Sequence, residues 1–163
     1  SLYSAFAVLY SFQLRNLLKG IGQQMKWSVR DESLHSKMGC QLFRHMCEED
    51  SSLLSECRED VIAAAKTMIE LEEKYIDKMF EMGDIEGIKS YDLKQFIKKR
   101  TNEKLVELGY VDLGSYFAYD TKAAGNLDWF YHLTGGVTHT DFFATRPTDY
   151  SKAGEGEDYE DIW

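Results

Sequence analysis

The sequence predicts an all-α fold that ends in a long, largely irregular tail. Residues up to about 108 are rich in helix formers, and their apolar positions recur at spacings of three and four. The only proline in the chain is Pro147, so no proline interrupts these helices. From Gly109 onward, glycine, aromatic residues and aspartate dominate, and no helical period persists. With 163 residues, 44% of them apolar, the chain is long enough to bury a core.

The first two helices are predicted from their apolar stripes and from the residues that end them. The first runs from about residue 2 to Leu18 and ends at Gly20 and Gly22, because glycine commonly terminates a helix. Its stripe consists of Leu2, Phe6, Leu9, Tyr10, Leu14 and Leu17. The second helix begins at about Gln23 and ends in the acidic residues 48–50. Its apolar residues are Met25, Trp27, Val29, Leu34, Met38, Leu42 and Met46.

Two further helices follow along the chain. Ser51 or Ser52 is expected to cap a third, long helix that continues to a turn at Gly83. Its apolar residues include Val61, Met68, Leu71, Tyr75 and Phe80. The fourth helix covers about Ser90 to Leu108. Three of its basic residues are expected to face water, namely Lys98, Lys99 and Arg100. Beyond it, only residues 127–133 are expected to form a short helix.

Charge and cysteine content exclude several classes of function. The formal net charge is -9 and the sequence pI about 4.9, whereas nucleic-acid binding requires an excess of Lys and Arg. No apolar run reaches the roughly 20 residues of a membrane-spanning helix. Cys40, Cys47 and Cys57 form no CxxC pair, and an odd number argues against a secreted disulfide framework. We therefore expect reduced thiols, a cytoplasmic protein, and neither nucleic acid nor membrane as a partner.

The most informative pattern lies on the second predicted helix, where Arg30 and Asp31 precede Glu32, and His35 follows three residues later. Residues three apart on a helix are neighbours, so Glu32 and His35 can bind one ion together. A carboxylate with an imidazole suits iron or manganese, and four-helix carboxylate proteins build dinuclear sites from two such pairs and two more carboxylates. The alternative is a solvated helix face, although in an otherwise apolar helix some of these side chains would then face inward unpaired.

Two segments of the chain carry a resemblance to a known family. The run Arg-Asp-Glu-Ser-Leu-His at residues 30–35 resembles the Arg-Asp-Glu-x-Leu-His signature of class I ribonucleotide reductase small subunits. Residues 140–153, which contain Asp-Phe-Phe, an arginine and a tyrosine, are similar to the tail segment of that family. The resemblance covers the whole chain, as the C-terminal half of the radical-carrying subunit. It implies half of a ferritin-like bundle over residues 1–108 and a tail over residues 109–163.

The resemblance implies roles for individual residues. Glu32 and His35 would be metal ligands. Asp31 would hydrogen-bond toward a ligand histidine on the radical-transfer path, and Arg30 would support that network. Tyr150 resembles the tail tyrosine that relays the radical to the large subunit. The acidic terminal peptide resembles the segment that docks on the large subunit, with three contact residues, Tyr159, Ile162 and Trp163.

The resemblance also implies a shared cofactor and several partners. The dinuclear centre is expected to be di-iron, with manganese–iron or dimanganese as alternatives, and its other ligands are expected on an N-terminal half. That half, the large subunit and a second small subunit are the expected partners. Because the family's ligand on the first helix falls just before Ser1, we expect a split gene product, a processed precursor or a truncated chain.

The predicted function is a share in the reduction of ribonucleotides to deoxyribonucleotides. This chain would supply half of the di-metal site and deliver a radical to the large subunit, and it is expected to be inactive alone. Two alternatives stay open on the residues themselves. One is another ferritin-like di-metal oxidase or hydroxylase, and the other is a metal-free helical interaction module in which the Glu-x-x-His pattern is fortuitous.

Overall fold

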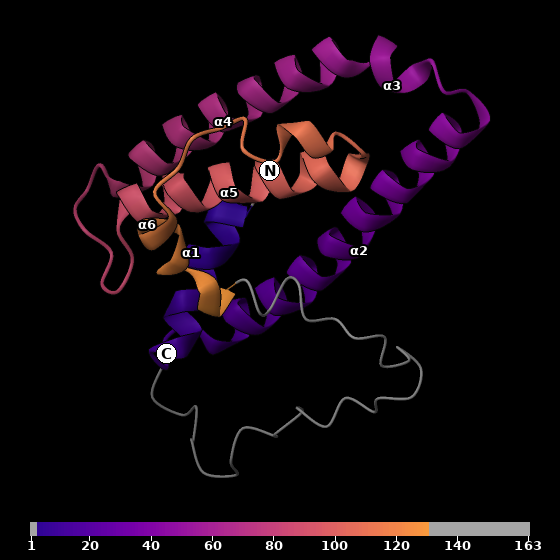
Figure 1. Cartoon of the computed structure of the whole chain (residues 1–163). Helices are drawn as coiled ribbons and strands as arrows, with labels where there is room; N and C mark the ends of the chain where they lie inside the picture. The colour runs from indigo at the N-terminus through magenta and orange to yellow at the C-terminus, as the bar shows by residue number, and fades with distance from the viewer. Residues whose placement is uncertain (1–2, 131–163) are drawn as a thin grey trace, which may run out of the picture.

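The computed structural model describes residues 3–130 and confirms an all-α fold (Figure 1). Its helices are, in chain order, α1 (Tyr3–Leu14), α2 (Lys19–Glu49), α3 (Leu53–Glu56), α4 (Arg58–Phe80), α5 (Ser90–Leu108), the 3-10 helix η1 (Val111–Leu113) and α6 (Thr121–Gly125). Strand-like pairing within this part of the chain is limited to one isolated bridge, between Ile85 and Ile88. This architecture agrees with a ferritin-like helical fold. None of these helices is long and apolar enough to span a membrane.

Helix α5 lies at the centre of the fold. It contacts α1, α2, α4, η1 and α6. Leu93, Phe96 and Ile97 of α5 are almost completely buried, together with Ile76 of α4 and Phe130. In Figure 1, α4 runs alongside α5, whereas α2 leaves the corner at α3 in a different direction from α4. The two longest helices therefore diverge from this corner, and α5 lies between them.

Helix α1 crosses the beginning of α2 at a glycine. A Cβ atom on Gly22 would lie 2.3 Å from the Cβ atom of Gln13, which is too close for any other residue to fit without a shift of the backbone. The prediction that Gly20 and Gly22 end the first helix is therefore wrong. Both lie inside α2, and Gly22 is needed for close packing and not for helix termination.

The chain turns between α1 and α2 earlier than the sequence predicts. The first helix ends at Leu14, and Asn16 and Leu18 adopt positive φ angles of 62° and 45°. Asparagine enters this left-handed region more readily than most residues, whereas a leucine there is unusual. Helix α2 starts directly after Leu18, so the predicted end at Leu18 is four residues too late.

The predicted third helix is divided at Cys57. This residue has φ -81° and ψ -7°, which interrupts the regular α-helical ladder between α3 and α4. Ser52 lies at the N-cap position as predicted, but its side chain accepts no capping hydrogen bond. Asp50 closes the turn in its place, since its Oδ1 atom accepts a hydrogen bond from the Ser52 N–H at 3.0 Å. The predicted turn at Gly83 is confirmed, with φ 126°.

Helix α5 begins and ends where the sequence predicts. Gly109 adopts a left-handed φ of 112° directly after it, and its N–H bonds to the carbonyl groups that end the helix. Lys98 and Lys99 are partly exposed, with side chains 26% and 24% accessible. The prediction that Arg100 faces water is wrong, because Arg100 is only 8% exposed. It lies four residues after Phe96, on the buried face of the helix.

The segment after α5 packs back onto this helix through side-chain hydrogen bonds to the backbone. The Asn102 Nδ2 atom donates to the Phe117 carbonyl at 2.9 Å, and the Phe117 N–H donates to Asn102 Oδ1 at 3.0 Å. The Asp120 N–H donates to Gln95 Oε1 at 3.0 Å, and the Asp120 carboxylate in turn caps α6. These bonds attach the irregular segment that follows α5 to that helix. The segment has no helical periodicity, so its sequence pattern does not predict this packing.

Two short helices in this segment, η1 and α6, are not among those that the sequence predicts. Residues 128–130 are helical, in agreement with the start of the helix expected at 127–133, and the remainder of that range lies outside the described residues. Leu113 and Leu127 are almost fully buried. The part of the predicted tail at residues 109–130 therefore contributes to the cores that cover α5.

The paired bonds between Asn102 and Phe117 give a first prediction. Asn102 is 2% exposed, so the substitution Asn102→Ala removes at once the side-chain partners of two partly buried backbone groups of Phe117. We expect it to lower the free energy of unfolding by about 2–4 kcal/mol, because an unsatisfied buried polar group costs roughly 1–3 kcal/mol. Urea denaturation measures this loss. Gln41→Ala, on an exposed position of α2, is the control and should change stability by less than about 0.5 kcal/mol. Equal effects of the two substitutions would contradict the prediction.

Candidate functional site

The two candidate metal ligands lie on the exposed surface of α2. The Glu32 Oε2 atom is 3.9 Å from the His35 Nδ1 atom, and the two side chains are 54% and 69% exposed. This separation is too long for a hydrogen bond. It suits two ligands of one ion, because transition metals such as zinc bond to oxygen and nitrogen at roughly 2.1 Å. The pair therefore has the donor chemistry and the spacing of two ligands.

Glu32 and His35 supply only part of a coordination sphere. Across residues 3–130, no group of three or more His, Cys, Asp and Glu side chains could hold a metal ion. Arg30 and Asp31, which precede the pair, are exposed as well. All four polar residues of the motif thus lie on an uncovered part of α2, and completing the site requires ligands from outside the described residues.

Glu32 borders a cavity of about 670 Å³ between α1, α2, α4 and α5. Most of the lining is apolar and includes Phe6, Val61, Met68, Ile97, Leu105 and Leu108. Two cationic residues of α5, Arg100 and Lys104, border the same space. The cavity therefore combines an apolar wall with one carboxylate and two cations.

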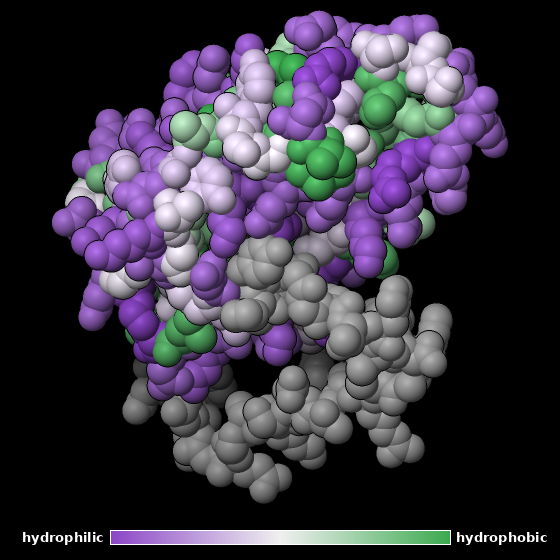
Figure 2. All heavy atoms as spheres, viewed as in Figure 1, coloured by the Kyte–Doolittle hydropathy of each residue, from purple (hydrophilic) through white to green (hydrophobic). Residues whose placement is uncertain are grey.

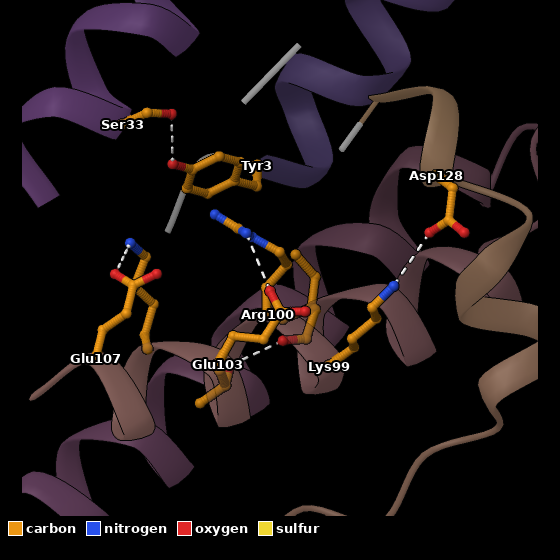
Figure 3. Close-up of polar contacts among 10 residues, drawn as sticks. Tyr3, Ser33, Lys99, Arg100, Glu103, Glu107 and Asp128 are labelled. Carbon is orange, nitrogen blue, oxygen red and sulfur yellow. Dashed lines mark hydrogen bonds and ion pairs between the residues drawn. The ribbon is translucent and has the colours of Figure 1, made fainter. Parts of the chain in front are cut away.

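Tyr3 connects three helices at the edge of this cavity (Figure 3). Its hydroxyl oxygen lies 3.1 Å from the Oγ atom of Ser33. Ser33 directly follows Glu32 in the sequence. The Arg100 guanidinium carbon is 5.3 Å from the centre of the Tyr3 ring, within the range of a cation–π contact. The Arg100 Nη1 atom also donates to Glu103 Oε2 at 3.0 Å. Tyr3 thus holds α1 against α2 and α5 close to the candidate ligand.

A buried carboxylate joins α1 to α4 in the same region. The Ser4 hydroxyl donates a hydrogen bond to Glu72 Oε2, and these residues are 0% and 4% exposed. Glu72 is not among the site residues predicted from the sequence. A signal is nevertheless present, because Glu72 lies three residues after Ile69 and four before Ile76, on the buried face of α4. In the same way, the spacing from Phe96 could have identified Arg100, whereas Tyr3 and Ser33 have no distinctive local pattern.

A large part of the apolar surface of α2 is uncovered. Five large apolar side chains of this helix are 47–63% exposed, namely Trp27, Leu34, Met38, Leu42 and Met46. The first four follow one another at spacings of seven, four and four, which places them on one face. Figure 2 shows that hydrophobic residues also interrupt the polar surface over α3 and α4. Contiguous exposed apolar surface of this kind commonly marks an interaction site.

Four predicted site residues lie outside the described residues. These are Tyr150, Tyr159, Ile162 and Trp163. The site that the structure describes is therefore the ligand pair on α2 with the adjoining cavity and Tyr3.

Comparison with known proteins identifies the family. Residues 1–114 match the family model described as ribonucleotide reductase, small chain. The chain belongs to this family. Glu32 and His35 lie within the matched residues, so the motif that carries the resemblance is part of the family match.

Curated relatives of the ribonucleotide reductase small chain are longer than this chain. A probable ribonucleoside-diphosphate reductase small subunit of Invertebrate iridescent virus 3 is 32% identical over 93% of this chain and 39% of its own length. That of Invertebrate iridescent virus 6 is 30% identical over 99% of this chain and 50% of its own. The ribonucleoside-diphosphate reductase subunit beta of Chlamydia pneumoniae is 27% identical over 93% of this chain and 42% of its own length. The chain thus spans half or less of these relatives. No solved structure gives a significant match.

The contact between Tyr3 and Ser33 gives a second prediction. If their hydroxyl groups hold α1 on α2, Tyr3→Phe and Ser33→Ala will not be additive. We expect a coupling free energy of about 0.5–1.5 kcal/mol in a double-mutant cycle measured by urea denaturation. The control cycle uses Tyr10→Phe, whose ring stacks on Trp129, with Ser33→Ala, and should be additive within about 0.5 kcal/mol. Additive effects in the first cycle would show that the hydroxyl contact contributes nothing.

Proposed function

We propose that this chain supplies part of the di-metal site of a ribonucleotide reductase small subunit and helps to deliver a radical for the reduction of ribonucleotides to deoxyribonucleotides. The observation that carries the proposal is the Glu32–His35 pair on α2, inside the residues matched to the family. The chain spans 39–50% of the length of three relatives of this family.

Glu32 and His35 would hold the metal through a carboxylate oxygen and an imidazole nitrogen. The bound metals, with iron expected and manganese–iron or dimanganese as alternatives, would supply the oxidising chemistry from which the radical arises. Asp31 and Arg30 precede Glu32 on an exposed turn of α2. Their proposed role in hydrogen bonding toward a ligand histidine therefore requires a further segment over this face.

The uncovered surface beside the ligands supports an N-terminal half as a partner. Trp27, Leu34 and Met38 lie on the exposed face of α2, and the apolar cavity adjoins Glu32 on the other side. A helix placed over this region would bury several large side chains, each contributing about 1.5–3 kcal/mol before ordering costs. The same helix could bring the missing carboxylates to the pair. Without such a partner we expect no turnover.

Association with the large subunit and with a second small subunit follows as a proposal from family membership. Tyr150 is proposed to relay the radical, and the acidic C-terminal peptide is proposed to dock on the large subunit. Tyr159, Ile162 and Trp163 would be its contact residues, because large apolar side chains anchor a bound peptide while its charges steer approach. This part of the proposal rests on the sequence.

Metal content tests the ligand assignment. We expect the chain alone to bind iron or manganese weakly, because two ligands leave most of the coordination sphere to water. Mixed with its complementary N-terminal half, it should take up about two metal ions per pair, as dinuclear carboxylate sites do. Elemental mass spectrometry measures this ratio.

The matched control for metal content lies on the same helix. His45 and Glu48 form a second pair three residues apart, with Nδ1 and Oε2 3.1 Å apart and both side chains exposed. Glu32→Ala should abolish most metal uptake by the mixture, and Glu48→Ala should leave it unchanged. Metal content that is unaffected by Glu32→Ala would rule out the ligand assignment.

Tyr150 is tested by removal of its hydroxyl group. Tyr150→Phe should leave metal uptake and association with the large subunit nearly unchanged, because the ring and its size are retained. Nucleotide reduction should be lost, since phenylalanine has no phenolic proton to release along with an electron. Tyr119→Phe serves as the control and should keep activity. Appreciable turnover by the Tyr150→Phe variant would exclude the relay role.

A further inference from the structure

Two cysteines lie at the corner from which α2 and α4 diverge. Cys47 is close to the C-terminal end of α2, and Cys57 joins the end of α3 to the start of α4. Both are free and half-buried, and the intervening residues 48–56 fold back through α3. A bond between these two side chains would tie the end of α2 to the beginning of α4.

Tyr110 brings both cysteines to one place in the structure. On α2, the Phe43 ring lies 6.3 Å from the Tyr110 ring, and Cys47 is four residues after Phe43, on the same face. On α4, the Arg58 guanidinium lies 5.8 Å from the Tyr110 ring, and Arg58 directly follows Cys57. Tyr110 therefore contacts a residue one helical turn from Cys47 on α2 and the residue directly after Cys57 on α4.

The electrostatics of these groups agree with this placement. Burial raises the pKa of Tyr110, and the Cys57 and Cys47 thiols raise it further, while Arg58 opposes them. Burial also raises the pKa of Cys47, and the Cys57 thiol adds to this effect. Both thiols thus raise the pKa of the Tyr110 phenol, and the Cys57 thiol raises the pKa of Cys47. In addition, Tyr110 is 2% exposed and its hydroxyl has no hydrogen-bond partner in the described part of the chain.

We propose that Cys47 and Cys57 form a reversible disulfide that locks the corner between α2 and α4. The oxidant is a low-molecular-weight disulfide such as oxidised glutathione. One cysteine thiolate attacks it and releases one glutathione thiolate, and the second cysteine thiolate then displaces the other. The two cysteines together lose two protons and two electrons, and the oxidant leaves as two reduced glutathione molecules.

The consequence of this bond is conformational. Helices α2 and α4 both line the cavity and are joined through α3, and Figure 1 shows that they diverge from this corner, so the corner influences how far they spread. A disulfide across the corner would restrict this spread when the chain is oxidised. The third cysteine, Cys40, is buried in the middle of α2, and the charged groups that affect its pKa, Lys104 and Glu107, belong to α5 and not to the corner. The proposal does not depend on metal binding.

The experiment uses the full chain with Cys40→Ser, which leaves only the two cysteines of the corner. Equilibration with oxidised and reduced glutathione, followed by acid quenching and mass spectrometry, should show the loss of two hydrogen atoms and a peptide in which Cys47 is joined to Cys57. Dithiothreitol should reverse both changes. With Cys57→Ser added, Cys47 should instead carry a mixed disulfide with glutathione.

A comparison with the unfolded chain shows whether the fold favours the bond. If the structure holds the thiols together, half-oxidation should require a ratio of oxidised to reduced glutathione at least about tenfold lower than in concentrated urea. An equal or higher ratio for the folded chain would overturn the proposal. A product with two glutathione adducts and no joined peptide, or a joined peptide only between two chains, would overturn it as well.

Discussion

The rest of the structure depends on the burial of α5. This helix places apolar residues against α4 and α1, and it also buries five polar side chains, namely Asp92, Gln95, Arg100, Thr101 and Asn102. Burying such groups is costly unless they are hydrogen-bonded. Asn102 and Gln95 meet this condition by binding backbone groups of the following segment, and Asp92 accepts a hydrogen bond from Asn126. The bonds that make α5 stable thus also determine the path of residues 115–126.

Helix α2 shows the opposite balance between burial and exposure. Among its 31 residues, Gly22, Val29 and Cys40 are buried, while its large apolar residues are mostly exposed. The helix is held by α1 at the Gly22 crossing, by contacts with α5 and by the corner at α3. The candidate ligands lie on this largely uncovered helix. A helix with so much apolar surface exposed gains from a partner, and the same partner could complete the coordination of a metal.

The features that sequence predicts well are those set by local pattern. The apolar period and Gly109 define both ends of α5, and the Glu32–His35 spacing places two candidate ligands side by side. Gly22 misleads because glycine both ends helices and permits close crossings, and only tertiary structure separates these uses. The contact of Tyr3 with Ser33 joins residues thirty positions apart, so no local pattern indicates it. Glu72 and Arg100 are missed because charge usually indicates exposure, whereas helical spacing places both on buried faces.

Spacing alone does not distinguish the two pairs of glutamate and histidine on α2, but their environments do. In the His45–Glu48 pair, the imidazole and carboxylate are 3.1 Å apart and satisfy each other by a hydrogen bond. In the Glu32–His35 pair, the 3.9 Å separation is too long for a hydrogen bond between the carboxylate and the imidazole. Glu32 also borders the cavity between α1, α2, α4 and α5, although more than half of its side chain is exposed. The geometry therefore makes the Glu32–His35 pair the better candidate of the two for metal ligands.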